Sequence, residues 1–250
     1  MLPILRIGPL SIQLPGLILL LGAWLGLTLA ELHARRHQIS ARDIYNLSLI
    51  ALLSAIVGAR LYYVLRYPNV FSQSLLSLFS LNPGLLDPIE GATTAAIAAI
   101  IYGQRRNLPF WSTLDALTPA LACTMIAISL SNLSSGAAFG APTSLPWGIE
   151  LWGAHRHPTQ IYETLAASLI LFILWPGQSW LRASFQGEYF LQLIAMSAAA
   201  RLLLEAFRGD SLLWMGGFRA AQIIAWLILA GCLLAIRYKQ RLSAPPKPVG

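Results

Sequence analysis

Long apolar runs separated by short polar connections dominate this sequence. A helix needs about 20 mostly apolar residues to cross the roughly 30 Å hydrocarbon core of a bilayer. The pattern predicts an all-α integral membrane protein with about seven transmembrane helices. The third and fifth runs are short, so we expect their ends to extend into flanking residues, with a helical hairpin or a re-entrant segment as alternatives. The seven runs are Leu14–Ala30, Tyr45–Leu65, Ile89–Tyr102, Leu114–Leu130, Tyr162–Trp175, Tyr189–Phe207 and Ala220–Ile236.

The connections between these runs indicate one continuous membrane domain. We expect a single polytopic domain over residues 1–242 and a disordered cytoplasmic tail over residues 243–250, which read SAPPKPVG. Residues 68–88 are apolar but broken by Pro, Asn and Gly, and this composition predicts a loop at the membrane surface. The longest outer connection, Ser131–His157, lies between spans four and five, and its tryptophans suit the headgroup level.

Composition supports a membrane protein and excludes an ordinary soluble domain. Hydrophobic residues make up 56% of the 250 and charged residues only 11%, whereas soluble domains carry roughly 25% charged residues. Lipid must therefore cover much of the surface. The net charge of +7 does not indicate nucleic-acid binding, because the basic residues lie in short loops rather than on one basic face interleaved with aromatic side chains.

These basic residues predict the orientation, because cytoplasmic loops of membrane proteins carry an excess of Lys and Arg. If the C-terminal RYKQR segment is cytoplasmic, alternation through seven spans places the N-terminus outside. Arg60 and Arg201 then lie within the membrane. The cytoplasmic side holds Arg35, Arg36, Arg42, Arg105, Arg106, Arg182, Arg237, Lys239, Arg241 and Lys247, and the outer side holds Arg6, Arg66, Arg156, Arg208 and Arg219.

Charged residues within the sixth span are the first candidates for chemistry, because ionisable groups are costly in a bilayer. In ARLLLEAFRGDS, Arg201, Glu205 and Arg208 are spaced i, i+4 and i+7, which places them on one helix face. Two guanidinium groups and one carboxylate predict a net positive stripe near the outer end, suited to a lipid phosphate. The alternative is a structural ion pair with an Arg208 that extends to the interface.

Two further segments hold polar groups of uncertain role. Arg60, in GARLYYVLR, either binds a lipid headgroup or pairs with an acid such as Glu90, Glu163 or Glu205. In HRHPTQIYE, a helix that begins near Pro158 would collect His157, Thr159, Gln160 and Glu163 at a polar pocket entrance, because helix N-termini attract anions. The alternative is an ordinary helix cap. His155 and His157 have no third ligand at a spacing suited to a metal.

Several of these segments resemble one known family. HPTQIYE, preceded by Arg156, resembles the most recognisable segment of the bacterial prolipoprotein diacylglyceryl transferase family. IGPLSI, GARLYYVL, SNLSSGAAFG followed by LPWGI, RLLLEAFR and MGGFRAAQIIA resemble other family segments in the same order. HPTQIYE and RLLLEAFR are the specific motifs, and the resemblance covers nearly the whole chain.

The resemblance implies both an architecture and a reaction. The architecture has seven helices, an outer N-terminus and a cytoplasmic C-terminus in the bacterial inner membrane. The reaction transfers the diacylglyceryl group of phosphatidylglycerol to the thiol of a lipobox cysteine in a preprolipoprotein. Glycerol phosphate leaves, a thioether forms, and no metal or other cofactor is implied. Cations would stabilise the charge on the departing phosphate, and a base would be needed to form the attacking thiolate.

If the chain is a transferase of this kind, the resemblance and the polar residues described above together suggest roles for residues of this sequence. Arg201, Arg208 and Asn132 would hold the lipid headgroup, and Glu205 would orient the arginines. His157 or Glu90 would accept the thiol proton. The catalytic candidates are therefore Arg201, Glu205, His157 and Glu90, and the substrate-binding candidates are Arg208, Asn132, Gly140, Arg60 and Gln160.

The sequence departs from the family pattern at four positions. Ser129 stands where the signature loop carries an arginine, and Ala137 stands where it carries an acid. Glu90 replaces a histidine of the third span and Pro15 replaces an N-terminal tyrosine. These losses motivate an alternative hypothesis, in which a catalytically degenerate paralogue keeps the fold and binds lipid or lipoprotein precursors. A small transporter is a third hypothesis, but no inverted repeat supports it.

Overall fold

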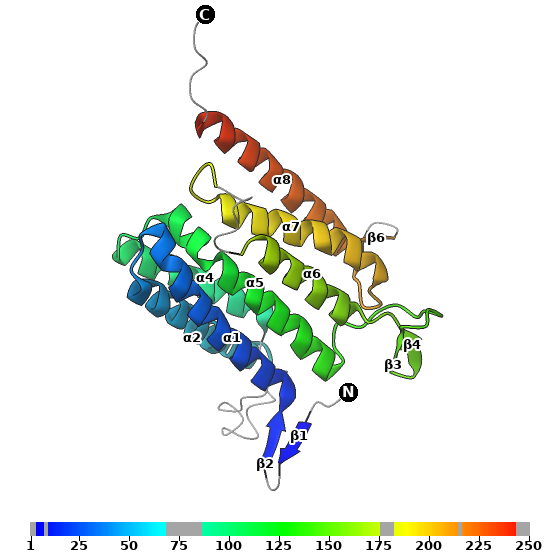
Figure 1. Ribbon diagram of the computed structural model, residues 1–250. Helices are drawn as coiled ribbons and strands as arrows, with labels where there is room; N and C mark the ends of the chain where they lie inside the picture. Colours follow the sequence, from blue (N-terminus) through cyan, green and yellow to red (C-terminus); the bar gives the residue numbers. More distant parts are fainter. Residues whose placement is uncertain (1–3, 8–9, 69–86, 176–182, 215–216, 244–250) are drawn as a thin grey trace, which may run out of the picture.

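The computed structural model describes residues 4–7, 10–68, 87–175, 183–214 and 217–243, which form a helical bundle with short β-hairpins at one end (Figure 1). The α-helices of this part are α1 (Leu14–Ala34), α2 (Ala41–Arg66), α4 (Pro88–Arg105), α5 (Phe110–Ser135), α6 (Thr159–Ile173), α7 (Glu188–Leu204) and α8 (Ala220–Ser243). Short 3-10 helices, η1 (Arg35–His37) and η4 (Glu205–Phe207), continue α1 and α7. The hairpins are β1 (Ile4–Ile7) with β2 (Leu10–Gln13), β3 (Ile149–Leu151) with β4 (Ala154–Arg156), and β5 (Leu213–Trp214) with β6 (Phe218–Arg219).

The predicted fold class, an α-helical multi-pass membrane protein, is confirmed. Within the described residues, five helical segments are long and apolar enough to cross a bilayer: Leu14–His37, Ala41–Arg66, Phe110–Ser135, Glu188–Phe207 and Ala220–Ser243. The two short runs form α4 and α6. The 15 residues of α6 would span only about 22 Å at about 1.5 Å per residue. The exact number of seven spans therefore stays a prediction.

Two predicted segments lie partly outside the described residues. Of the expected surface loop over residues 68–88, only 68 and 87–88 are described. Of the expected tail, only Ser243 is described, and it is the last residue of α8.

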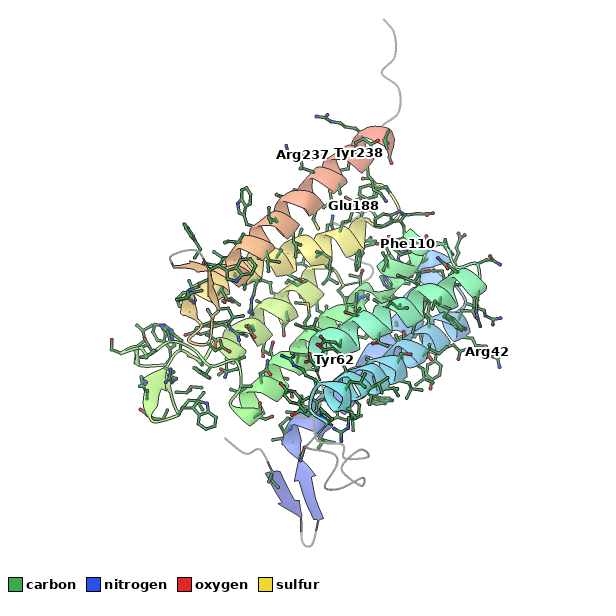
Figure 2. All side chains as sticks on the ribbon, turned by 180° about the vertical axis from the view of Figure 1, so that it is seen from behind. Arg42, Tyr62, Phe110, Glu188, Arg237 and Tyr238 are labelled. Atoms are coloured by element: carbon green, nitrogen blue, oxygen red, sulfur yellow. The ribbon has the colours of Figure 1, made fainter. Side chains whose placement is uncertain are left out.

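The helices run in alternating directions, so the described N- and C-terminal ends lie at opposite ends of the bundle (Figure 1). The β-hairpins lie at the end where α1 begins, together with the long connection between α5 and α6 (Figure 1). Figure 2 shows Arg42 and Arg237 at the other end, although they come from α2 and α8. Basic residues far apart in the sequence thus gather at the end away from the hairpins.

Small residues let α1 and α5 pack closely. Gly22, Gly26 and Ala30 follow each other at intervals of four, so they lie along one face of α1, and all three are buried. A Cβ atom on Gly22 would overlap the Cβ of Ala127, and one on Gly26 would lie 3.4 Å from the carbonyl oxygen of Ala120. In a bilayer, helices associate through such close van der Waals contact because lipid tails are as apolar as the side chains.

Gly22→Ala should therefore destabilise the bundle, by about 1–3 kcal/mol if the helices must separate to admit one methyl group. The loss would appear as a lower Tm of the detergent-solubilised protein. Gly103→Ala in α4 is the matched control, because a Cβ there meets no atom within 4 Å. Equal Tm values for the two variants would contradict the packing argument.

A second pair of helices, α2 and α4, also packs closely through small residues. A Cβ on Gly58 would overlap the side chain of Thr94, and one on Gly91 would lie 3.0 Å from the carbonyl oxygen of Ala55. By their main packing contacts, α4 packs on α2, α2 on α1, α1 on α5, α5 on α6, α6 on α7 and α7 on α8. The α2–α4 pair is therefore separated from α7 by α1 and α5.

A carboxylate on α5 fixes the start of α7. Asp115, which is 1% exposed, accepts hydrogen bonds from the backbone N–H groups of Gly187 (2.6 Å) and Phe190 (3.0 Å). The first N–H groups of a helix have no partner within the helix, and the dipole there favours a negative charge. Asp115 satisfies both requirements and sets the position of the helix that carries Arg201.

Candidate active site

The connection between α5 and α6 forms the base of the site. α5 ends at Ser135 because Gly136 adopts a left-handed conformation (φ 78°), and its N–H bonds the carbonyl of Asn132. Thr159 and Gln160, both fully buried in the first turn of α6, donate hydrogen bonds to the carbonyls of Ala138 (2.8 Å) and Ala137 (2.7 Å). The first turn of α6 therefore holds the loop in place.

The same loop is bonded to the end of α7. Ala141 N–H donates to the carbonyl of Phe207 (2.8 Å), and Gly209 N–H donates to that of Phe139 (3.0 Å). Gly140, predicted as a site residue, lies in this contact, and a Cβ there would overlap the carbonyl oxygen of His157. Only glycine leaves room for these backbones to approach, so Gly140 shapes the site through its backbone.

A network of charged side chains lies where this loop meets α6 and α7. Arg201 Nε is 2.9 Å from Glu205 Oε2, and Arg201 Nη1 donates to Glu163 Oε1 at 3.2 Å. Arg208 Nη1 donates to the same Glu163 oxygen at 2.8 Å. Arg208 also forms a bidentate pair with Asp210, at 2.9 and 2.7 Å. The structure thus brings together Arg201, Glu205 and Arg208, as their helical spacing predicted.

The charge balance of this cluster differs from the predicted positive stripe. The sequence pattern placed two arginines around one carboxylate, but three carboxylates face the two guanidinium groups: Glu163, Glu205 and Asp210. The prediction was wrong in this respect because it considered one helix face only. Glu163 belongs to α6, which packs on α7, and Asp210 lies beside Arg208 because the chain turns back after η4.

Arg208 nevertheless stays charged. Burial alone would lower the pKa of its guanidinium, but the hydrogen bond to Asp210 and the charge of Glu163 outweigh burial and raise that pKa above its usual value. Its side chain is only 12% exposed. A permanent cation is therefore held near the hairpin end of the bundle.

A third arginine, Arg219, supports the turn that carries Glu205 and Arg208. Its Nη1 group donates to the carbonyls of Glu205 and Arg208 (the latter at 2.9 Å) and to the hydroxyl of Ser211 (3.0 Å). The last carbonyls of a helix lack partners within the helix and attract cations. Arg219, the last residue of β6 directly before α8, thus stabilises the turn after α7 and orients the arginine cluster.

Two cavities lie on either side of α7, and Arg201 borders both. One, of about 180 Å³, lies among α5, α6 and α7. The other, of about 370 Å³, lies between α7 and α8. Apart from Ser129, Ser197, Glu163 and Arg201, the walls consist of Ala, Ile, Leu and Met. A polar group that binds Arg201 would therefore have apolar space beside it.

His157 lies in an aromatic cluster next to the charged network. Its ring is 5.1 Å from that of Phe207, and its Nδ1 is 3.4 Å from the hydroxyl of Tyr162. The same hydroxyl accepts a hydrogen bond from Trp147 Nε1 at 2.9 Å. Trp147 and Tyr162 were not among the predicted site residues, since nothing in the sequence indicates that the loop folds back onto α6.

The remaining predicted residues lie at differing distances from this centre. Asn132 is half-buried on the last turn of α5, close to the loop. Gln160 faces the loop backbone, and its Oε1 is buried without a hydrogen-bond partner. Arg60 and Glu90 lie on the α2–α4 pair, which the structure does not bring next to α7. Of the departures, Ser129 lies in α5 and borders the smaller cavity. Pro15 lies in α1, and its carbonyl accepts a hydrogen bond from Ser131 of α5.

The sequence placed Glu163 at a polar pocket entrance but gave it no contact with Arg201 or Arg208, and Asp210 was not predicted. Glu163 belongs to the specific motif HPTQIYE, and an acid within an apolar run is itself a signal of a functional residue. Asp210 directly follows the RLLLEAFR motif. Among the described residues, no group of three His, Cys, Asp or Glu side chains is spaced to hold a metal ion.

Comparison with known proteins decides the family. The family model for prolipoprotein diacylglyceryl transferase matches residues 3–238. This chain belongs to the prolipoprotein diacylglyceryl transferase family. The phosphatidylglycerol–prolipoprotein diacylglyceryl transferase of Finegoldia magna is 32% identical over 229 residues, which cover 91% of each chain. The enzymes of the same name from Clostridioides difficile and Streptococcus pneumoniae are 28% and 30% identical, over 89% and 96% of this chain and 89% and 95% of their own lengths. The resemblance inferred from the motifs is thereby confirmed over nearly the whole of this chain.

Proposed function

We propose that this protein transfers the diacylglyceryl group of phosphatidylglycerol to the cysteine thiol of a lipobox-containing prolipoprotein. Family membership over residues 3–238 supports the reaction, and so do relatives of that name that match over most of their length. The single structural observation that supports it best is the position of Arg201. Arg201 borders two apolar cavities, so a phosphate bound to its guanidinium group would have apolar space nearby for the acyl chains.

The orientation proposed for the chain places this site at the outer face of the membrane. The end of the bundle away from the hairpins is where α1, α4 and α8 end and α2 begins, and Figure 2 shows Arg42 and Arg237 there. By these bounds it carries Arg35, Arg36, Arg42, Arg105, Arg106, Arg237, Lys239 and Arg241. An excess of positive charge marks the cytoplasmic side. The arginine cluster and the hairpins then face outward, where exported prolipoproteins present their cysteine.

The proposed roles follow from the geometry of the cluster. Arg201 and Arg208 bind the phosphate of phosphatidylglycerol and stabilise the charge that grows on it as the glycerol C–O bond breaks. Glu205, buried 2.9 Å from Arg201, holds that guanidinium in place. Asn132 and the backbone around Gly140 contribute to the headgroup site. The positions of Arg60 and Glu90 favour a role in pairing α2 with α4 over a role at the phosphate.

The test is a transfer assay with the full-length protein in vesicles. Phosphatidylglycerol labelled in its acyl chains is supplied with a lipobox peptide, and a peptide with Ser in place of the lipobox Cys is the control. Label is expected on the Cys peptide alone. Lipid binding without transfer, by well-folded protein, would instead support the degenerate paralogue suggested by Ser129, Ala137, Glu90 and Pro15.

A further inference from the structure

One carboxylate oxygen connects the two arginines of the cluster. Glu163 Oε1 lies 2.8 Å from Arg208 Nη1 and 3.2 Å from Arg201 Nη1. Glu163 comes from α6 and the arginines come from the end of α7, so this oxygen also joins two helices. Its side chain is only 16% exposed and borders the smaller apolar cavity.

The other two acids of the cluster each make their short contacts with one arginine. Asp210 binds Arg208 through two oxygens. Glu205 lies 2.9 Å from Arg201 and at the longer distance of 4.0 Å from Arg208. Glu163 is therefore the additional anion, and it occupies the place between the two guanidinium groups that both can reach. A phosphate has the same charge sign and the same acceptor oxygens, and it suits the forked geometry of arginine equally well. A lipid phosphate and Glu163 would compete for this place.

We propose that Glu163 occupies the phosphate position in the lipid-free protein, is displaced when phosphatidylglycerol binds, and then accepts the proton of the substrate thiol. The inference rests on the proposed transferase function and adds a catalytic residue to it. The carboxylate that leaves both cations stays beside the apolar cavity, where it can accept a proton from a thiol that binds there. Displacement by the lipid thus couples lipid binding to activation of the thiol.

The step balances as a single displacement. The thiol proton moves to the Glu163 carboxylate, and the sulfur forms a bond to the terminal glycerol carbon of the diacylglyceryl group. The bond between that carbon and the phosphate oxygen breaks, and its electron pair leaves with glycerol phosphate, whose added charge Arg201 and Arg208 stabilise. When glycerol phosphate departs, Glu163 releases its proton and returns to the arginines.

Glu163 is better placed for this role than the two acceptors predicted from the sequence. His157 Nδ1 faces the hydroxyl of Tyr162, and its ring packs on Phe207. Glu90 belongs to α4, which is separated from α7 by α1 and α5. Glu163 is already in contact with both groups that would bind the leaving phosphate.

Glu163→Gln is the decisive variant, because the amide keeps the shape of the side chain but has neither the charge nor the basicity. We expect its kcat for transfer to fall by about 10²–10⁴, the usual contribution of a general base. Its KM for phosphatidylglycerol should fall as well, because the competing anion is gone. A purely structural residue would raise KM when removed. Glu163→Asp keeps the carboxylate and should recover part of kcat.

Phosphatidylglycerol binding is measured separately, with phosphatidylcholine vesicles that contain increasing fractions of phosphatidylglycerol. Glu163→Gln should bind more tightly than wild type, and Glu150→Gln, an exposed acid of the β3–β4 hairpin, should bind as wild type does. Unchanged kcat, or weaker lipid binding, in a folded Glu163→Gln protein would overturn the inference. If Glu163→Gln does not fold, the transfer activities of Glu163→Asp and Glu163→Ala are compared instead. The inference requires Glu163→Asp to be the more active of the two, and equal activities would contradict it. A wild type that binds lipid but transfers nothing would refute the transferase function and the proton step, while tighter binding by Glu163→Gln would still support the anion exchange.

Discussion

Arg201→Ala should nearly abolish diacylglyceryl transfer, with a fall in kcat/KM of at least about 10²–10³, as expected when one group that stabilises transition-state charge is removed. Arg201 is expected to have the largest effect because it borders both cavities and contacts two carboxylates. The transfer assay with labelled phosphatidylglycerol measures the loss. Arg201→Lys keeps the charge but not the planar, forked guanidinium group, so its kcat/KM should lie between those of wild type and Arg201→Ala.

Arg106→Ala is the matched control for this prediction. Arg106 also pairs with an acid, Asp43 at 3.0 Å, but at the opposite end of the bundle and with its side chain 52% exposed. Its loss should leave transfer unchanged. Wild-type transfer by Arg201→Ala would refute the phosphate-binding role of the cluster.

Glu205→Ala should be the most destabilising change at the site. The Glu205 side chain is 1% exposed and lies 2.9 Å from Arg201 Nε. Removal of one partner from a fully buried ion pair costs about 3–5 kcal/mol. The loss here should be smaller than that, because the Arg201 side chain is 39% exposed and keeps Glu163 at 3.2 Å. The Tm of the protein in detergent should fall strongly, and transfer should fall with it because Arg201 is no longer held.

Two comparisons test the cause. Glu205→Gln keeps the size of the side chain, so it should lose less stability than Glu205→Ala while still losing activity. Glu150→Ala removes an acid that is 76% exposed and pairs with His155 at 3.3 Å, and exposed pairs contribute little. If Glu150→Ala and Glu205→Ala lowered the Tm equally, burial of the pair would not be the reason.

The departures from the family pattern acquire a physical meaning in this structure. Ser129, which stands where the family carries an arginine, borders the cavity that Glu163 and Arg201 also border. An arginine there would add another cation beside the two guanidinium groups of Arg201 and Arg208 and their three carboxylates. In the proposed exchange, the lipid phosphate displaces Glu163 without a cation at position 129. Glu163 is therefore expected to control lipid affinity, and Ser129→Arg should reduce the effect of Glu163→Gln on that affinity.

Helices were predictable from the sequence where the signal is local. Residues 45–65 and 220–236 are continuous apolar runs, and they became the longer helices α2 and α8. The helix ends were less predictable, since they depend on caps. α5 continues to Ser135, five residues beyond its apolar run, because the left-handed Gly136 ends it. α6 begins at Thr159, before its apolar run, because buried Thr159 and Gln160 bond the loop.

By itself the sequence determined the class of protein, the approximate positions of the helices and the shared face of Arg201, Glu205 and Arg208. Each of these follows from hydropathy or from the helical repeat, which act between neighbours in the chain. Only the tertiary structure decided the charge of the site and which residues belong to it. Glu163 and Asp210 join the arginines because α6 packs on α7 and the chain reverses after η4, while Arg60 and Glu90 go elsewhere because small residues pair α2 with α4. Which helix packs on which depends on contacts distant in the sequence, and periodicity along one chain does not contain that information.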